Sequence, residues 1–169
     1  MRAAVVAIED LPSGLKTVHE CWNTLRGAGM APAWADIDLM SFPPKLLPTT
    51  MVVDIRSPLS ESVFRYWGSK LTEIHGVEMT SRCPYDLSPP DLGRQLLADH
   101  REIVEKKIPL ARHYSFLSSA GYIHSHSLIR LPLSDDGVNV NHIIVVVDYS
   151  PEAMALMRLG REKFAEAVD

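Results

Sequence analysis

The apolar positions of residues 13–26 recur every three or four residues, and Gly27 follows them. Leu15, Val18 and Trp22 belong to this pattern, which predicts an amphipathic helix with Ser13 as its N-cap. The next segment, residues 31–48, contains four prolines and is therefore predicted to form turns with at most a very short helix. An N-terminal helical extension is expected to precede the rest of the fold.

The central part of the chain predicts two strands followed by helices. Residues 50–55 and 63–67 are rich in β-branched or aromatic side chains, and residues 68–75 form a short helical pattern. Ser88, followed by two prolines, begins a longer helix that is predicted to extend to about residue 107. Its apolar face is expected to carry Leu92, Leu96, Leu97, His100, Ile103 and Val104, and its polar face Gln95, Asp99, Glu102 and Lys106.

The last third of the chain predicts three strands, at residues 110–117, 122–133 and 140–149. The third strand contains the unbroken apolar run 143–147, which is typical of a central strand covered on both faces. A closing amphipathic helix is predicted at residues 151–168.

These elements predict an α+β fold with a five-stranded antiparallel sheet and helices on one face, plus an N-terminal amphipathic helix and a C-terminal helix. The expected division is an N-terminal helical extension at residues 1–30, a domain at residues 31–150 and a C-terminal helix at residues 151–169. The second face of the central strand needs a cover, and the N-terminal helix or a partner subunit is the expected one.

The charge of the chain argues against two classes of partner, and the lack of an export signal indicates its location. The 169 residues carry a net charge of −4 with no basic block, which argues against binding to nucleic acid or to an anionic membrane. No export signal and no apolar stretch of about 20 residues is found, so a cytoplasmic location is expected. Cys21 and Cys83 match no metal-ligand spacing and are expected to be reduced thiols.

Several segments resemble those of PAS domains, and in particular those of a stand-alone proteobacterial PAS family. They are residues 35–38 (ADID), 42–48 (FPPKLLP), 51–55 (MVVDI), 64–71 (FRYWGSKL), 74–76 (IHG), 79–82 (MTSR) and 131–137 (LPLSDDG). The resemblance implies a sensory or signal-relay domain rather than an enzyme. It also implies a homodimer, a small-molecule ligand, and a separate signalling partner in place of a fused output domain.

His100 is a candidate ligand-binding residue on the predicted long helix. In haem-binding PAS domains the iron ligand is a histidine of this helix, so the resemblance makes His100 a candidate for that role. A histidine at the edge of the core, hydrogen-bonded to a neighbour, is the favoured alternative. No cofactor is assigned from the sequence.

The predicted hairpin of residues 110–133 carries three further histidines. His124 and His126 share one face of their strand, and His113 joins that face only if the connecting loop has an even length. Three imidazoles together would suit zinc and would support a metal-dependent enzyme as an alternative function. A polar or pH-responsive face is favoured, because no carboxylate or cysteine stands at ligand spacing.

The other face of the hairpin is predicted to hold Arg112, Tyr114 and Phe116 opposite Ser125 and Ser127. If that face lines a cavity, Arg112 would pair with an anionic ligand group while the aromatic rings pack against the ligand. The alternative is that Arg112 reaches solvent or an internal acid.

Other chemistry finds little support in the sequence. Cys83 is followed by Pro84 and Tyr85 and so lacks the motif of flavin-binding photosensor PAS domains, which favours a structural thiol. No hydrolase, zinc-protease, phosphate-loop or dinucleotide-binding motif is present. Three functions stay open at this point: a sensor, a metal-dependent enzyme, and an interaction module whose core is filled and binds no ligand.

Overall fold

A computed structural model describes residues 2–88, 90–117 and 123–149 of the chain. They form one six-stranded antiparallel sheet in the order β1-β4-β5-β6-β2-β3. The strands are β1 (Arg2–Val5), β2 (Thr50–Asp54), β3 (Val63–Trp67), β4 (Leu110–Leu117), β5 (Ile123–Leu133) and β6 (His142–Tyr149). The α-helices are α1 (Ser13–Arg26), α2 (Ser69–His75) and α3 (Pro90–Lys106). Short 3-10 helices are η1 (Ile8–Asp10), η2 (Trp34–Asp36), η3 (Leu39–Ser41), η4 (Pro44–Thr49), η5 (Leu59–Glu61) and η6 (Pro84–Asp86).

The predicted central position of the last strand is confirmed. β6 lies between β5 and β2, and its residues 142–147 are all buried. Ile143 and Val145 pack into the core on the α3 side, whereas Ile144 and Val146 pack into the core on the α1 side. The period of two along a strand thus explains why this segment is apolar at every position.

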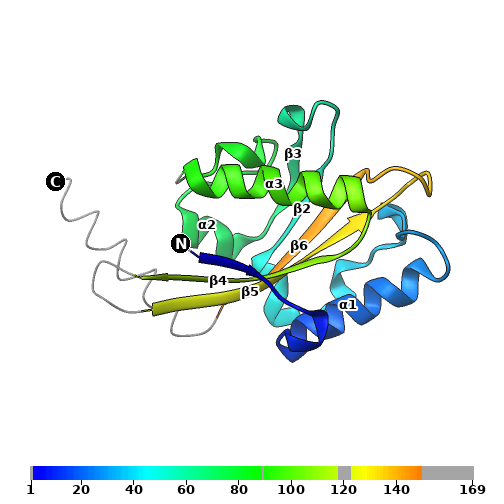
Figure 1. The fold of residues 1–169 in the computed structure, drawn as a ribbon, viewed down its shortest axis with the longest axis horizontal. Coiled ribbons are helices and arrows are strands. Elements are labelled where there is room, and N and C mark those ends of the chain that lie inside the picture. The colour runs from blue at the N-terminus through cyan, green and yellow to red at the C-terminus, as the bar shows by residue number, and fades with distance from the viewer. Residues whose placement is uncertain (1, 89, 118–122, 150–169) are drawn as a thin grey trace.

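Helix α1 covers the second face of the sheet, as Figure 1 shows, with α1 and α3 on opposite sides. Leu15 and Val18 are fully buried, and Trp22 is 3% exposed. The indole Nε1 of Trp22 donates a 2.7 Å hydrogen bond to the carbonyl of Pro132 in β5. The N-terminal helix is therefore an integral layer of the fold, and the sheet face on its side is not open.

Two expectations about the N-terminal region are corrected by the structure. β1, which was not predicted, adds a sixth strand by pairing with the edge strand β4. Residues 3–5 are exposed, so the strand is held mainly by backbone hydrogen bonds and leaves no alternating apolar pattern in the sequence. Ser13 is the first residue of α1, whose N-cap is Pro12, so no side chain caps the helix.

The remaining predicted elements agree with the structure to within one or two residues, and the predicted C-terminal helix lies outside the described residues. Gly93 allows α3 to approach η6 closely, because a Cβ atom at this position would lie 2.1 Å from the carbonyl oxygen of Tyr85. This contact holds Tyr85 beside His100 on α3. Among the helices of the described residues, none has the length and apolar character that crossing a bilayer requires.

Candidate functional site

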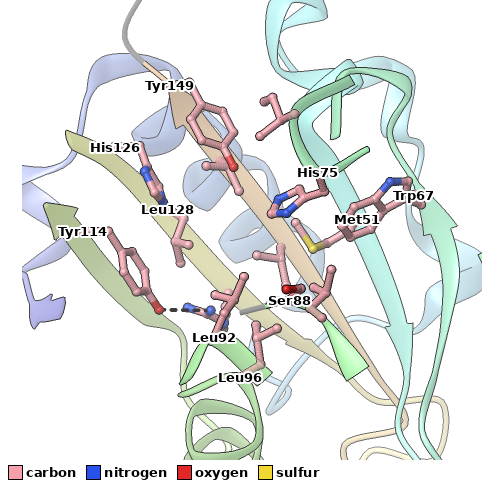
Figure 2. Close-up of a pocket in the computed structure, with 15 residues that line it drawn as sticks. Met51, Trp67, His75, Ser88, Leu92, Leu96, Tyr114, His126, Leu128 and Tyr149 are labelled. Carbon is pink, nitrogen blue, oxygen red and sulfur yellow. Dashed lines mark hydrogen bonds between the residues drawn. The ribbon is translucent and has the colours of Figure 1, made fainter. Parts of the chain in front are cut away.

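A cavity of about 380 Å³ lies on the α3 side of the sheet. Most of its lining is apolar, with polar groups contributed mainly by the central strands. Its lining residues are Met51, Trp67, Ile74, His75, Leu87, Ser88, Leu92, Leu96, Tyr114, His126, Leu128, Arg130, Val145, Val147 and Tyr149. Figure 2 shows Tyr114, His126 and Leu128 on one side of this space and Met51, Trp67 and His75 on the other.

Aromatic rings are concentrated around the cavity. The ring of Tyr114 stacks on His126 with the centroids 5.2 Å apart, and His126 in turn lies 4.7 Å from the ring of Tyr149. On the opposite side, the centroids of Trp67 and His75 are 5.4 Å apart. These rings present flat, weakly polar surfaces against which a small planar molecule can pack.

A buried network of charged side chains lies beside the cavity, and Asp99 of α3 is its centre. Oδ1 of Asp99 is 2.7 Å from Nε of Arg112 and 2.9 Å from Nε2 of Gln95. Oδ2 accepts a 3.2 Å hydrogen bond from the Tyr114 hydroxyl and lies 3.1 Å from Nη1 of Arg130. The side chains of Asp99 and Arg130 are 0% and 1% exposed, so the network ties α3 to β4 and β5 inside the core.

The guanidinium of Arg130, which lines the cavity, has few hydrogen-bond acceptors among the described residues. Its Nη2 donates a 3.4 Å hydrogen bond to the Tyr114 hydroxyl, drawn as a dashed line in Figure 2. Nε and Nη1 are buried and have no aligned hydrogen-bond acceptor among the described residues. The 3.1 Å contact between Nη1 and Asp99 is therefore an electrostatic pairing rather than a good hydrogen bond.

Asp99 and Arg130 were not among the predicted site residues. The helical pattern placed Asp99 on the polar face of the long helix, but the structure buries it completely. The sequence signal for this pair that was missed is Arg130. It stands between Ile129 and Leu131 in an apolar strand and shares a face with Leu128. A cation at such a position requires a buried acid nearby.

The register of the β4–β5 hairpin corrects the predicted faces. Tyr114 pairs with His126 and His113 pairs with Ser127, so Tyr114 and His126 share the cavity face whereas His113 lies on the opposite face. The loop of residues 118–122 has an odd number of residues, which is the case that separates His113 from the other histidines. The structure therefore has the odd-length alternative, in which His113 does not join His126 and the possible three-histidine cluster of His113, His124 and His126 does not form.

The same register separates the two sets of predicted ligand-binding residues. Arg112 pairs with Leu128 on the cavity side, whereas Ser125 and Ser127 lie on the other side, where Nδ1 of His113 is 3.0 Å from Oγ of Ser127. The prediction that the two serines share a face with Arg112 and Tyr114 is thus wrong. Phe116 pairs with His124, and the side chains of both lie outside the described part of the structure.

His100 is fully buried within α3 but is not among the described residues that line the cavity. Its Nδ1 lies 3.3 Å from the Tyr85 hydroxyl, and its Nε2 has no partner among the described residues. A haem iron ligand has to face the space that the haem fills, so the position of His100 does not fit that role. The arrangement matches the favoured alternative of a core histidine bonded to a neighbour.

Comparison with solved structures finds PAS and light-oxygen-voltage (LOV) domains. The light-state LOV domain of the blue-light photoreceptor Aureochrome1 is 13% identical, with a TM-score of 0.44 over 69% of this chain and 92% of that one. A PAS domain from Colwellia psychrerythraea is 11% identical, with a TM-score of 0.44 over 61% and 86%. VqmA of Vibrio cholera, in a complex with ligand and DNA, is 16% identical, with a TM-score of 0.48 over 62% and 47%. No protein-family model and no curated protein matches.

The predicted α+β fold with an antiparallel sheet is confirmed by the structure itself. The solved structures found are PAS and LOV domains, the superfamily that the sequence resembles, but their TM-scores below 0.5 carry the comparison no further. Cys83 is a free thiol that lies 3.5 Å from the carbonyl of Ser60, and it is not among the described residues at the cavity.

The pKa values of two buried histidines, His100 and His126, predict how the stability of the folded chain depends on pH. Burial, reinforced by the positive charge of Arg130, lowers the pKa of His100 from 6.5 to about 3. Burial, followed by the neighbouring His113, lowers the pKa of His126 from 6.5 to about 4. Both imidazoles are therefore neutral at pH 7 in the folded protein.

We expect the free energy of unfolding to fall as the pH drops below about 6.5, because the unfolded chain then takes up protons that the folded chain excludes. Each histidine lowers the free energy of unfolding by up to about 1.4 kcal/mol for each unit that the pH falls. This loss continues until the pH reaches the pKa of that histidine in the folded protein. Urea unfolding at pH 7, 6, 5 and 4 measures this slope. His100→Gln should lose less stability between pH 6 and 4 than the unmodified protein, and parallel curves would contradict the assignment.

Proposed function

We propose that this chain is a sensory PAS-like domain that binds a small molecule in the cavity between α3 and the sheet. The cavity carries the proposal, because its volume of about 380 Å³ lies within the range of about 300–1,000 Å³ typical of ligand sites. Its mostly apolar lining with a few convergent polar groups is also typical of such sites. Binding and signalling, rather than catalysis, are the functions that this arrangement supports best.

Two observations disfavour the other functions considered from the sequence. An interaction module with a filled core predicts that side chains occupy the interior, whereas this interior contains a cavity of ligand size. A metal-dependent enzyme built on three histidines requires His113 and His126 on one face, whereas the hairpin register places them on opposite faces.

We propose that ligand occupancy is communicated through α3. Leu92 and Leu96 of this helix line the cavity, and Asp99 on the same helix ties it to β4 and β5. A ligand that contacts both the helix and the sheet favours one position of α3 over others, which is how a binding event shifts a population of conformations.

The predicted homodimer, the separate signalling partner and the cytoplasmic location stay predictions. The apolar face of α1 is already packed on the sheet of its own chain, so a dimer has to use other surfaces of α1 or other elements. Of the two covers expected for the second face of the central strand, the N-terminal helix and a partner subunit, the first is present.

A cavity-filling substitution tests the proposed site. Val147 of β6 is 2% exposed and lines the cavity, so Val147→Phe places a ring in the space that a ligand needs. We expect toluene, an apolar probe of cavities, to raise the melting temperature of the unmodified protein and to have little effect on Val147→Phe. Val138→Phe is the matched control, since Val138 is 60% exposed and lies away from the cavity. An equal response of all three proteins to toluene would contradict the site.

A further inference from the structure

Two arginines beside the cavity share one fully buried carboxylate. Asp99 pairs with Arg112 and Arg130, at 2.6 and 3.1 Å. Glu102 lies 3.6 Å from Arg112 and 2.8 Å from Lys106. The side chains of Lys106 and Glu102 are 58% and 33% exposed, so water screens their charges. Inside the core, Arg112 and Arg130 therefore share the single carboxylate of Asp99.

Arg130 is the charged member of this network that lines the cavity. It is 1% exposed, it lines the cavity, and its Nε and Nη1 have no aligned acceptor among the described residues. Asp99 supplies only part of its bonding, because Oδ1 of Asp99 is bonded to Arg112 and Gln95. Its Oδ2 lies 3.1 Å from Nη1 of Arg130 without an aligned hydrogen bond and also accepts from the Tyr114 hydroxyl. A buried guanidinium with N–H groups that lack acceptors destabilises the fold, unless an anionic group binds them.

We propose that the natural ligand of the cavity is a small apolar or aromatic molecule with a single carboxylate, and that Arg130 recognises this carboxylate. The inference rests on the proposed function and adds the chemical class of the ligand. A carboxylate presents two oxygens to the planar fork of an arginine, and its negative charge would give Arg130 a counter-charge that it does not share with Arg112.

The other walls of the cavity fit the remainder of such a molecule. The side chains of Leu96, Leu128 and Val147 offer apolar contact, and the ring of Tyr149 offers a flat surface. Burial raises the pKa of Tyr149, so its hydroxyl stays protonated and able to donate to an oxygen of the ligand. A phosphate dianion fits less well, because its second negative charge would meet mostly apolar walls and the ion is strongly hydrated in water.

The test compares three probes of similar shape: benzoate, its neutral amide benzamide, and toluene. Each is titrated into the full-length protein at pH 7, and binding is followed by isothermal calorimetry and by protein NMR. We expect benzoate to bind at least tenfold more tightly than benzamide. In Arg130→Met, which keeps most of the side-chain volume but removes the charge, this preference should disappear while toluene still binds.

The outcomes separate the two proposals. Equal affinity for benzoate and benzamide, with toluene bound, would overturn the carboxylate inference and leave the binding site intact. Failure of all three probes to bind would overturn the proposed function and the inference with it. Arg130→Lys gives a second comparison if Arg130→Met does not fold, because it keeps the charge but loses the fork. It should retain part of the preference, and an unchanged or increased preference would argue against recognition by the guanidinium.

Discussion

Asp99→Asn should lower the free energy of unfolding by about 3–5 kcal/mol, which is the cost of removing one partner from a buried ion pair. Asp99 is 0% exposed and lies within 2.6 Å of Arg112 and 3.1 Å of Arg130. The amide keeps the size of the carboxylate but carries no charge. Arg130 in particular would then be a buried cation with no counter-charge, and equilibrium unfolding in urea measures the resulting loss.

Glu102→Gln is the matched control for this prediction. Its carboxylate is 33% exposed and lies 3.6 Å from Arg112, so water screens the interaction and the expected loss is below about 1 kcal/mol. A double-mutant cycle with Arg130→Met isolates the pairing, since the loss caused by Asp99→Asn should shrink once Arg130 is uncharged. Equal losses for Asp99→Asn and Glu102→Gln would show that the network does not stabilise the fold as described.

Trp22→Ala should lower the free energy of unfolding by a similar amount, about 3–5 kcal/mol, because it removes a large buried side chain. The indole is 3% exposed and is packed in the core on the α1 side of the sheet. The substitution also removes the 2.7 Å hydrogen bond to Pro132, leaving that carbonyl without its donor. Urea unfolding followed by circular dichroism measures this loss.

Leu25→Ala provides a comparison on the same helix. Leu25 is 44% exposed, so its truncation should change the stability by no more than about 0.5 kcal/mol. If α1 were an appendage that folds apart from the sheet, Trp22→Ala would be as mild as Leu25→Ala. A large difference between the two variants supports the view that α1 is a layer of the core.

Much of the fold could be predicted because hydrophobic periodicity reports burial directly. The run 143–147 predicted a central strand, and β6 holds that position with alternate residues in the two cores. β1 was not predicted because its exposed residues show no alternation of apolar and polar side chains, and backbone pairing with β4 holds the strand in place. Local pattern thus finds elements that bury side chains and misses an edge strand that does not.

The site was predictable only in part, for two physical reasons. The face assignment of the β4–β5 hairpin depended on whether its loop has an odd or even length, and a change of one residue reverses every side chain. Arg112 and Tyr114 were recognised from the sequence as candidates near a cavity. Asp99 was missed because a charged residue on a helix is normally exposed, and only the fold brings it to the buried Arg130 and the partly buried Arg112.

Native mass spectrometry of the freshly purified full-length chain tests the central claim most directly, with a denatured aliquot measured in parallel. We expect a fraction of the native protein to carry one small organic molecule that is absent after denaturation. Val147→Phe should lack this extra mass and Val138→Phe should keep it, because Val147 lines the cavity and Val138 does not. The same added mass on all three proteins would contradict binding in this cavity. So would the absence of any added mass on all three, if the supplied probes also fail to bind.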